Sequence, residues 1–85
     1  MKKEEEFFVY ILFSNTFERF YVGMTNDLKR RLKQHNSNQV LSTKAYSPWS
    51  MVHNEKFDTR EEARRREKYL KSAAGRRWRK NNLRM

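Results

Sequence analysis

An unbroken run of large apolar residues, Phe7 to Phe13, constrains this chain more than any other feature. Its length and its β-branched and aromatic residues suit a strand. Apolar side chains fill positions of both parities, which is typical of a strand that is buried on both faces of its sheet. We therefore expect structure on both sides of the sheet that contains this strand.

Two further strands are predicted. The first lies over 19–23, after turn-like residues, and a four-residue loop at 14–17 would pair Tyr10 directly with Tyr21 on one sheet face. The second runs from Trp49 to Phe57. Alternation within it places four side chains on one common face: Met51, His53, Glu55 and Phe57. The polar stretch 36–48 is predicted to be a loop.

Helices are predicted in the remaining segments. Thr25-Asn26 supplies an N-cap and Asp27 a first-turn charge for a helix whose inward face carries Leu28, Arg31, Leu32 and His35. Thr59 and Glu62 form a capping box that opens a second helix, which runs to about Ala74 with Gly75 as its C-cap. A short basic helix is predicted over about 76–82.

Size and composition narrow the possible functions. The chain has 85 residues, no cysteine, and 20 Lys/Arg against 10 Asp/Glu, a net charge of +10. One domain, 1–85, is therefore expected, and disulfides, thiol chemistry and cysteine-bound zinc are excluded. No apolar stretch is long enough to span a membrane and residues 1–6 lack a signal-peptide core, so we expect a soluble, cytoplasmic protein.

The positive charge is concentrated in the last third of the chain. Residues 60–85 contain 11 Lys/Arg and 3 Asp/Glu, whereas residues 1–59 are nearly balanced. A polyanion is the natural partner of such a segment, and nucleic acid is the commonest one. An anionic membrane surface is the competing interpretation, but the segment lacks the broad apolar face that this needs.

Glu67 is the most informative residue by spacing alone. It lies within an apolar stripe of the second helix, between Ala63 and Leu70. A carboxylate in such a place pairs with a cation or binds a metal, because its burial alone is costly. The structural alternative is a salt bridge to Arg64 or Lys71. Tyr10, Tyr21, Arg31 and His35 each have structural alternatives too, as core tyrosines and a solvated basic helix edge.

Short motifs in order along the chain resemble the GIY-YIG nuclease superfamily. Phe8-Val9-Tyr10 and Tyr21-Val22-Gly23 are similar to its paired signatures. The resemblance continues through 25–32 and His35, and again through 62–72 and Gly75-Arg76. It covers nearly the whole chain and is closest to the small single-domain bacterial members and to the N-terminal domain of excision-repair nucleases.

The resemblance implies an α+β fold, a three-stranded antiparallel sheet flanked by helices, and metal-dependent hydrolysis of phosphodiester bonds. By position, Glu67 matches the ligand of one Mg²⁺ or Mn²⁺ ion, and Arg31 matches the arginine that binds the scissile phosphate. Tyr10 and Tyr21 match the motif tyrosines, one of which activates water, and His35 matches a histidine that could accept a proton.

Three positions depart from the family pattern. Phe8 replaces the glycine of the first signature, as it does in the small members. Met24 stands where several relatives carry a lysine, so any help of that lysine in phosphate binding is absent. Many members carry a late asparagine near the active site. Asn81 and Asn82 are candidates for it, but the surrounding residues do not fix the alignment, so that role is unassigned.

These observations predict an endonuclease that cleaves DNA with low sequence specificity, in DNA repair or recombination, on branched or damaged DNA or with a protein partner that supplies specificity. The alternative is a catalytically weak or inactive DNA- or RNA-binding module on the same fold. Under both, the basic surface over 60–84 holds the flanking backbone. We expect these residues to bind nucleic acid: Lys44, Arg64, Arg65, Lys68, Lys71, Arg76 and Arg77.

Overall fold

A computed structural model describes residues 5–83 of the chain. The elements within that range are β1 (Phe7–Ser14), β2 (Arg19–Thr25), α1 (Leu28–Asn36), a 3₁₀ turn η1 (Lys44–Tyr46), β3 (Ser50–Phe57), α2 (Arg60–Lys71) and α3 (Ala73–Asn82). The 3₁₀ turn lies in the stretch that was predicted to be a loop. No helix in the described range is long and apolar enough to cross a membrane.

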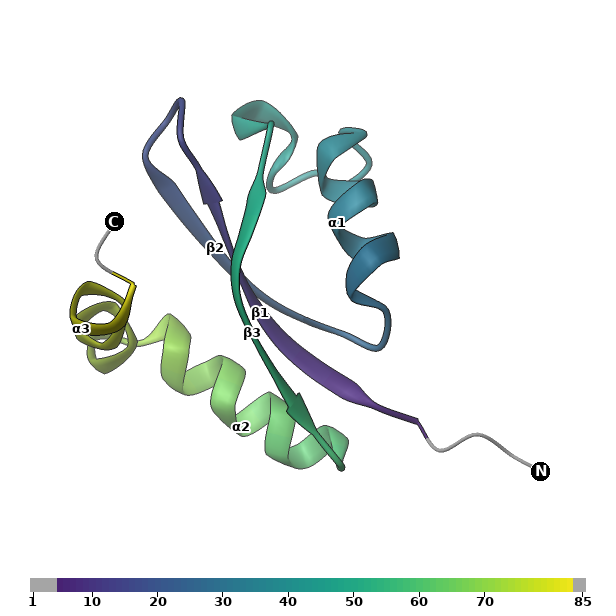
Figure 1. Cartoon of the computed structure of the whole chain (residues 1–85), viewed down its shortest axis with the longest axis vertical. Helices are drawn as coiled ribbons and strands as arrows, with labels where there is room; N and C mark the ends of the chain where they lie inside the picture. The colour runs from purple at the N-terminus through teal and green to yellow at the C-terminus, as the bar shows by residue number, and fades with distance from the viewer. Residues whose placement is uncertain (1–4, 84–85) are drawn as a thin grey trace.

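The three strands form one antiparallel sheet in the order β2-β1-β3. Helix α1 covers one face of this sheet, and α2 and α3 cover the other (Figure 1). We call these the α1 face and the α2/α3 face. The expected α+β fold with a three-stranded antiparallel sheet flanked by helices is therefore confirmed.

The apolar run forms the central strand and is buried on both sides, as its pattern predicted. Val9 and Ile11 pack under Ala63 and Leu70 on the α2/α3 face. Tyr10, Leu12 and Trp49 form a second cluster on the α1 face. Four of the central strand's side chains, Val9 to Leu12, have no exposed surface, so this strand anchors both layers.

The predicted register of the first hairpin is wrong by two residues. Its loop is 15–18, with Ser14 paired to Arg19, and Tyr10 is paired with Gly23 while Tyr21 is paired with Leu12. A shift of two residues keeps every side chain on its face, so the two tyrosines still lie on the α1 face with ring centroids 6.3 Å apart. Glu18 provides the left-handed residue of the loop, with φ of 51°.

The prediction that four β3 side chains share one face is wrong for Met51. The ladder is irregular between Ile11, paired with His53, and Leu12, paired with Met51, so Val52 is an extra residue. Such a bulge reverses the alternation. Val52 and Phe57 therefore pack on the α2/α3 face, whereas Met51 packs on the α1 face.

The helix caps are partly as predicted. Asp27, and not Thr25 or Asn26, is the N-cap of α1, since its carboxylate accepts a hydrogen bond from the Arg30 N–H at 3.1 Å. Thr25 instead accepts from the Asp27 N–H at 3.1 Å and fixes the turn before the helix. The capping box is present at α2, where the Thr59 hydroxyl accepts from the Glu62 N–H at 3.2 Å.

The predicted C-cap of α2 at Gly75 is wrong. The helix ends at Lys71, because Ser72 adopts extended backbone (φ −82°, ψ 175°) and its hydroxyl then caps α3 at the Gly75 N–H. Gly75 lies in the first turn of α3, and a Cβ there would overlap the Leu70 carbonyl. The glycine is therefore needed for the close contact of the two helices and not for a helix end.

Candidate active site

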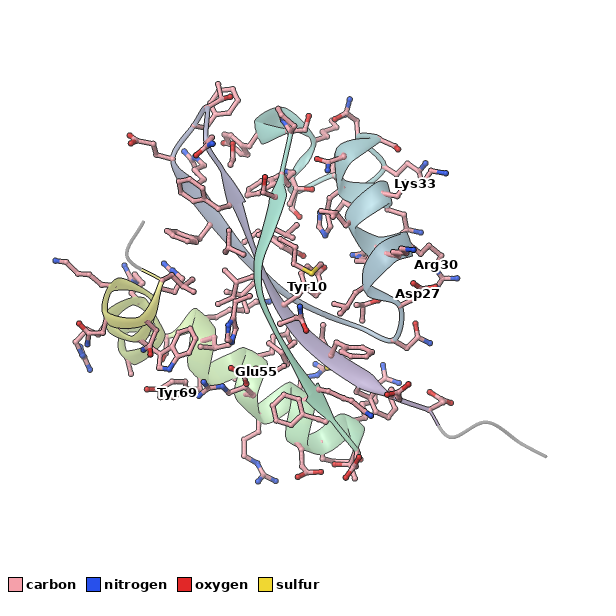
Figure 2. All side chains as sticks on the ribbon, in the orientation of Figure 1. Tyr10, Asp27, Arg30, Lys33, Glu55 and Tyr69 are labelled. Carbon is pink, nitrogen blue, oxygen red and sulfur yellow. The ribbon has the colours of Figure 1, made fainter. Side chains whose placement is uncertain are left out.

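A chain of hydrogen bonds runs through the α1 face from Tyr10 to Thr43. The Tyr10 hydroxyl lies 2.9 Å from Nε2 of His35, and Nδ1 of His35 lies 2.8 Å from the Thr43 hydroxyl. All three residues are buried, with at most 1% of their surface exposed. Figure 2 shows Tyr10 between the sheet and α1. Buried polar groups are tolerated here because each has a partner.

The partners of Thr43 indicate which way this chain donates. The Thr43 hydroxyl donates to the Val40 carbonyl at 3.4 Å, so it accepts from Nδ1–H of His35. Nε2 is then free to accept from the Tyr10 hydroxyl. Burial lowers the pKa of His35 to about 4, and the nearby Arg31 charge adds to this effect. His35 is therefore neutral at pH 7, and its Nε2 accepts a hydrogen bond from Tyr10.

Arg31 reaches the same hydroxyl from α1. Its Nε donates to the Tyr10 oxygen at 3.4 Å, and its Nη1 donates to Oε1 of Gln34 at 3.0 Å. The hydrogen bond to Tyr10 raises the pKa of Arg31, and interactions with Tyr21 add to it. Burial raises the pKa of Tyr10 to about 12, against the effect of Arg31. The phenol is thus protonated at rest, between a fixed cation and a neutral base.

Tyr21 and Gly23 complete this arrangement from β2. The Tyr21 ring lies 4.9 Å from the His35 ring between centroids, and Tyr21 is only partly buried. A side chain at Gly23 would overlap the Tyr10 hydroxyl. Gly23 therefore does more than end a strand, since its missing side chain is the space that the Tyr10 phenol occupies across the ladder.

Glu67 lies on α2 and pairs with Lys71, with Oε2 and Nζ 3.2 Å apart. This is the salt bridge that was the structural alternative, made with Lys71 and not with Arg64. The Glu67 side chain is 16% exposed, and its charge is near enough to act on the pKa of Tyr10. Glu67 therefore lies half-buried on α2, engaged by Lys71, and its charge is the weakest of the effects that act on the pKa of Tyr10.

The donor set around Glu67 decides which metal it could hold. The described residues contain no group of three His, Asp or Glu side chains that could hold a metal ion. Mg²⁺ keeps several waters and is commonly bound by one or two carboxylates together with a substrate phosphate. A lone half-buried carboxylate fits that mode of binding, and it does not fit a closed structural site.

The predicted nucleic-acid-binding residues lie on exposed surface. Lys44 is on η1, Arg76 and Arg77 are on α3, and the other four are on α2. Lys71 is engaged by Glu67, whereas none of the others forms an ion pair within the described range. Arg84, the end of the predicted basic surface, lies outside the described residues. Asn81 and Asn82 are exposed at the end of α3, and the Asn82 amide donates to the Trp78 carbonyl at 2.8 Å.

Sequence reasoning missed two residues that hold the network in place. Thr43 supports His35 from the loop before η1, and nothing in a polar loop singles out one threonine. Gln34 supports Arg31, and their spacing of three residues on a helix is a signal that could have found it. Trp49 fixes the loop in turn, since its Nε1 donates to the Thr43 carbonyl at 3.0 Å.

Comparisons with known proteins show what this chain is similar to. The family profile described as the GIY-YIG catalytic domain matches residues 6–82. A UPF0213 protein of Listeria welshimeri is 39% identical over 72 residues, which cover 84% of this chain and 79% of the relative. A UPF0213 protein of Bacillus velezensis is 44% identical over 57 residues, which cover 66% of this chain and 57% of the relative.

A solved structure also matches. The solution NMR structure of a UPF0213 protein from Bacillus halodurans superposes with a TM-score of 0.52 at 32% sequence identity. The match covers 86% of this chain and 80% of that one. Both the fold and the sequence are therefore similar over most of the two chains.

Proposed function

Because this chain belongs to the GIY-YIG family, we propose that it is a divalent-metal-dependent endonuclease that hydrolyses DNA phosphodiester bonds. The family is a nuclease superfamily. The proposal concerns the activity of this chain, the metal that it uses and the substrate that it cleaves. The observation that carries the proposal is the buried chain from Arg31 through Tyr10 and His35 to Thr43.

This row of hydrogen-bonded side chains supports a catalytic role, because burying so many polar groups lowers the free energy of unfolding of a small core. A leucine and a phenylalanine could fill the same space without a need for partners. The chain instead holds a guanidinium, a phenol and a neutral imidazole in one connected set. Such a set can bind an anion through the guanidinium and hold that guanidinium in a fixed orientation through the phenol and the imidazole, as binding of the scissile phosphate requires.

We assign roles by burial and by charge. Arg31 binds the scissile phosphate, since its planar fork suits two phosphate oxygens. Tyr21 is the tyrosine that meets the attacking water, because it is partly exposed whereas Tyr10 is closed off from solvent. Tyr10 holds Arg31 in place, and its hydroxyl is itself oriented by the hydrogen bond to Nε2 of His35.

Glu67 would hold Mg²⁺ or Mn²⁺ after release of Lys71. A divalent ion there supplies positive charge against the charge that develops on the leaving oxygen. The exposed basic residues of α2 and α3 then hold the flanking backbone. Backbone contacts carry little sequence information, so we propose low sequence specificity, with selectivity from DNA shape or from a protein partner, as in repair or recombination.

The test is cleavage of supercoiled, branched and single-stranded DNA with Mg²⁺ or Mn²⁺. Wild type is compared with Glu67→Gln and with Glu61→Gln, a matched loss of charge at an exposed position of the same helix. We expect wild type and Glu61→Gln to nick DNA and Glu67→Gln to lose at least about 100-fold in rate at unchanged DNA affinity. Equal cleavage by Glu67→Gln and wild type would contradict the role of Glu67.

A binding module without turnover is the second candidate. Two observations favour it: the Tyr10 hydroxyl is fully buried, and Lys71 already neutralises Glu67. Exposed basic and aromatic residues would serve DNA or RNA binding equally well. Tight binding by wild type with no cleavage of any substrate would establish this function in place of the first.

A further inference from the structure

A polar cleft opens beside the buried network, where β2 ends. It has a volume of about 420 Å³. Its lining comes from α1, from the first residue of α2, from the start of β1 with the residues before it, and from the end of β2 with the turn that follows, so it lies between the two helical layers. The lining residues that matter here are Thr25, Asn26, Arg30, Arg31, Gln34 and Arg60. Arg31 thus belongs both to this cleft and to the network around Tyr10.

Arg30 and Arg60 bring two further positive charges to this cleft. Neither side chain forms an ion pair within the described part of the chain, and both residues are exposed. The contrast with Arg66 is informative, because its Nε and Nη2 donate to the two carboxylate oxygens of Glu55 at 2.9 and 3.0 Å. Arginines that are gathered without a carboxylate partner form a site for an anion.

Adjacent residues on a helix do not point the same way, being about 100° apart around the axis. Arg30 and Arg31 therefore cannot present their guanidinium groups to one phosphate in the same manner. Arg31 is turned inward to Tyr10, whereas Arg30 projects from the outer side of α1 (Figure 2). Arg60 approaches from the other layer, so the cleft has an inner and an outer cationic part.

We propose that Arg30 and Arg60 form a second phosphate site, which holds the backbone phosphate next to the one bound by Arg31. This rests on the proposed function in that the partner is a nucleic acid and that Arg31 binds one of its phosphates. A strand held at two successive phosphates is fixed in direction as well as in position across the end of β2. Glu5, which also lines the cleft, opposes this binding and limits its strength.

The experiment measures binding without catalysis. Fluorescence anisotropy of a labelled 20-base-pair duplex and of a single strand of the same length, in EDTA, gives affinity as a function of salt. The double variant Arg30→Gln/Arg60→Gln is compared with Lys29→Gln/Lys33→Gln. The control removes the same charge from exposed positions of α1 that do not line the cleft.

We expect the cleft variant to lose about tenfold in affinity and to reduce the slope of log K against log salt by about one, as for the loss of one phosphate contact. The control should change affinity about twofold, and Arg30→Lys/Arg60→Lys should keep most of the slope. Glu5→Gln should bind more tightly than wild type. These variants are at exposed positions, and thermal unfolding checks that each is folded.

An equal loss of affinity and slope in the cleft variant and the control would overturn the second phosphate site. This outcome is separate from the failure of the proposed function. A protein that binds DNA through the cleft and never cleaves it would refute the nuclease and leave the phosphate site in place. A protein that cleaves DNA but whose affinity for DNA does not depend on Arg30 and Arg60 would support the nuclease and refute the second phosphate site.

Discussion

The two faces of the sheet bury different kinds of side chain. On the α2/α3 face, Ile11, Ala63 and Leu70 make an apolar cluster, and the charged groups lie at its rim, where Arg66 binds Glu55. On the α1 face, the fully buried residues include Tyr10 and His35. Figure 2 shows this difference, with Tyr10 on the side of α1 and Glu55 and Tyr69 on the side of α2.

The difference separates apolar packing from the buried polar part of the candidate site, whose remaining member Glu67 lies on α2. Apolar burial stabilises a fold whatever the exact partner, at about 25 cal/mol per Å² of surface removed from water. A buried hydroxyl or imidazole contributes little net stability, because it exchanges bonds to water for bonds to protein. The α1 face therefore retains its polar groups at a cost that an apolar core would avoid, and such a cost is typical of functional sites.

The rim of the α2/α3 face shows what a structural charge looks like in this protein. Both carboxylate oxygens of Glu55 accept hydrogen bonds from Arg66, and one also lies 2.8 Å from Nε2 of His53. Burial opposes the ionisation of Glu55, but these hydrogen bonds together outweigh it and lower its pKa. Arg66 is held by this ion pair, whereas Arg30 and Arg60 form none within the described residues.

The sharpest way to break this comparison is to change one residue on each face. Tyr10→Phe should reduce cleavage at least about 100-fold, since it unlinks Arg31 from His35. Leu70→Ala should cost about 2–5 kcal/mol of unfolding free energy, as other deletions of buried leucines do. It should leave the rate of the folded protein nearly unchanged. Denaturant unfolding and single-turnover cleavage, measured at a temperature where both variants are folded, give the two quantities.

Two results would contradict the assignment of stability to Leu70 and of catalysis to Tyr10. A large loss of rate in fully folded Leu70→Ala would mean that packing under α2 sets the position of Glu67. A loss of unfolding free energy above about 3 kcal/mol in Tyr10→Phe would mean that the phenol is a structural group, beyond the cost of leaving His35 without its donor. Tyr21→Phe is the matched variant, and the assigned role predicts a loss of rate there as well.

As the pH falls, protonation of His35 on the α1 face should lower the free energy of unfolding. The pKa of His35 is lowered from 6.5 to about 4 by burial and by Arg31, so the unfolded chain binds a proton that the folded one refuses. The unfolding free energy is therefore highest above pH 6.5 and falls as the pH drops toward 4, by about 3 kcal/mol at most. Urea unfolding at steps between pH 7 and pH 5 measures the slope.

Variants of the two histidines assign that slope to one face. His35→Gln should flatten it, because the group that must stay neutral is gone. His53→Gln removes the other histidine, which lies on the α2/α3 side beside Trp78, and should keep the slope. A slope that survives in His35→Gln would show that another group controls the acid sensitivity.

Much of this fold could be predicted because it depends on local patterns. The parity of the run over 7–13 gave the burial on both faces, and the spacing of Leu28, Arg31, Leu32 and His35 gave the inward face of α1. The capping box at Thr59 marked the start of α2 within one residue. The predicted register pairs Tyr10 with Tyr21, and the observed one pairs Tyr10 with Gly23. Because the two registers differ by two residues, Tyr10 and Tyr21 lie on the same face of the sheet in both.

The rest depends on contacts that no local pattern records. The hairpin register places Gly23 opposite Tyr10, where only a glycine leaves room for the phenol. The bulge sends Val52 and Met51 to different faces of the sheet. The break at Ser72 lies within a continuous helical pattern, since the close contact of Gly75 with Leu70 is visible only in three dimensions. The cleft of Arg30 and Arg60 joins residues of two elements with no motif between them.

The smallest effects are expected from substitutions of the N-cap residues of α1 and α2, one on each face of the sheet. Asp27 and Thr59 cap α1 and α2 in the same way, so replacement of either by alanine should cost about 1 kcal/mol of unfolding free energy. Only Asp27 carries charge, three residues from Arg30, so Asp27→Asn should keep the cap and still strengthen DNA binding slightly. Thr59→Ala should weaken the fold with no gain in affinity. An equal change of affinity in both would mean that helix stability, and not the charge beside the cleft, governs binding on the α1 face.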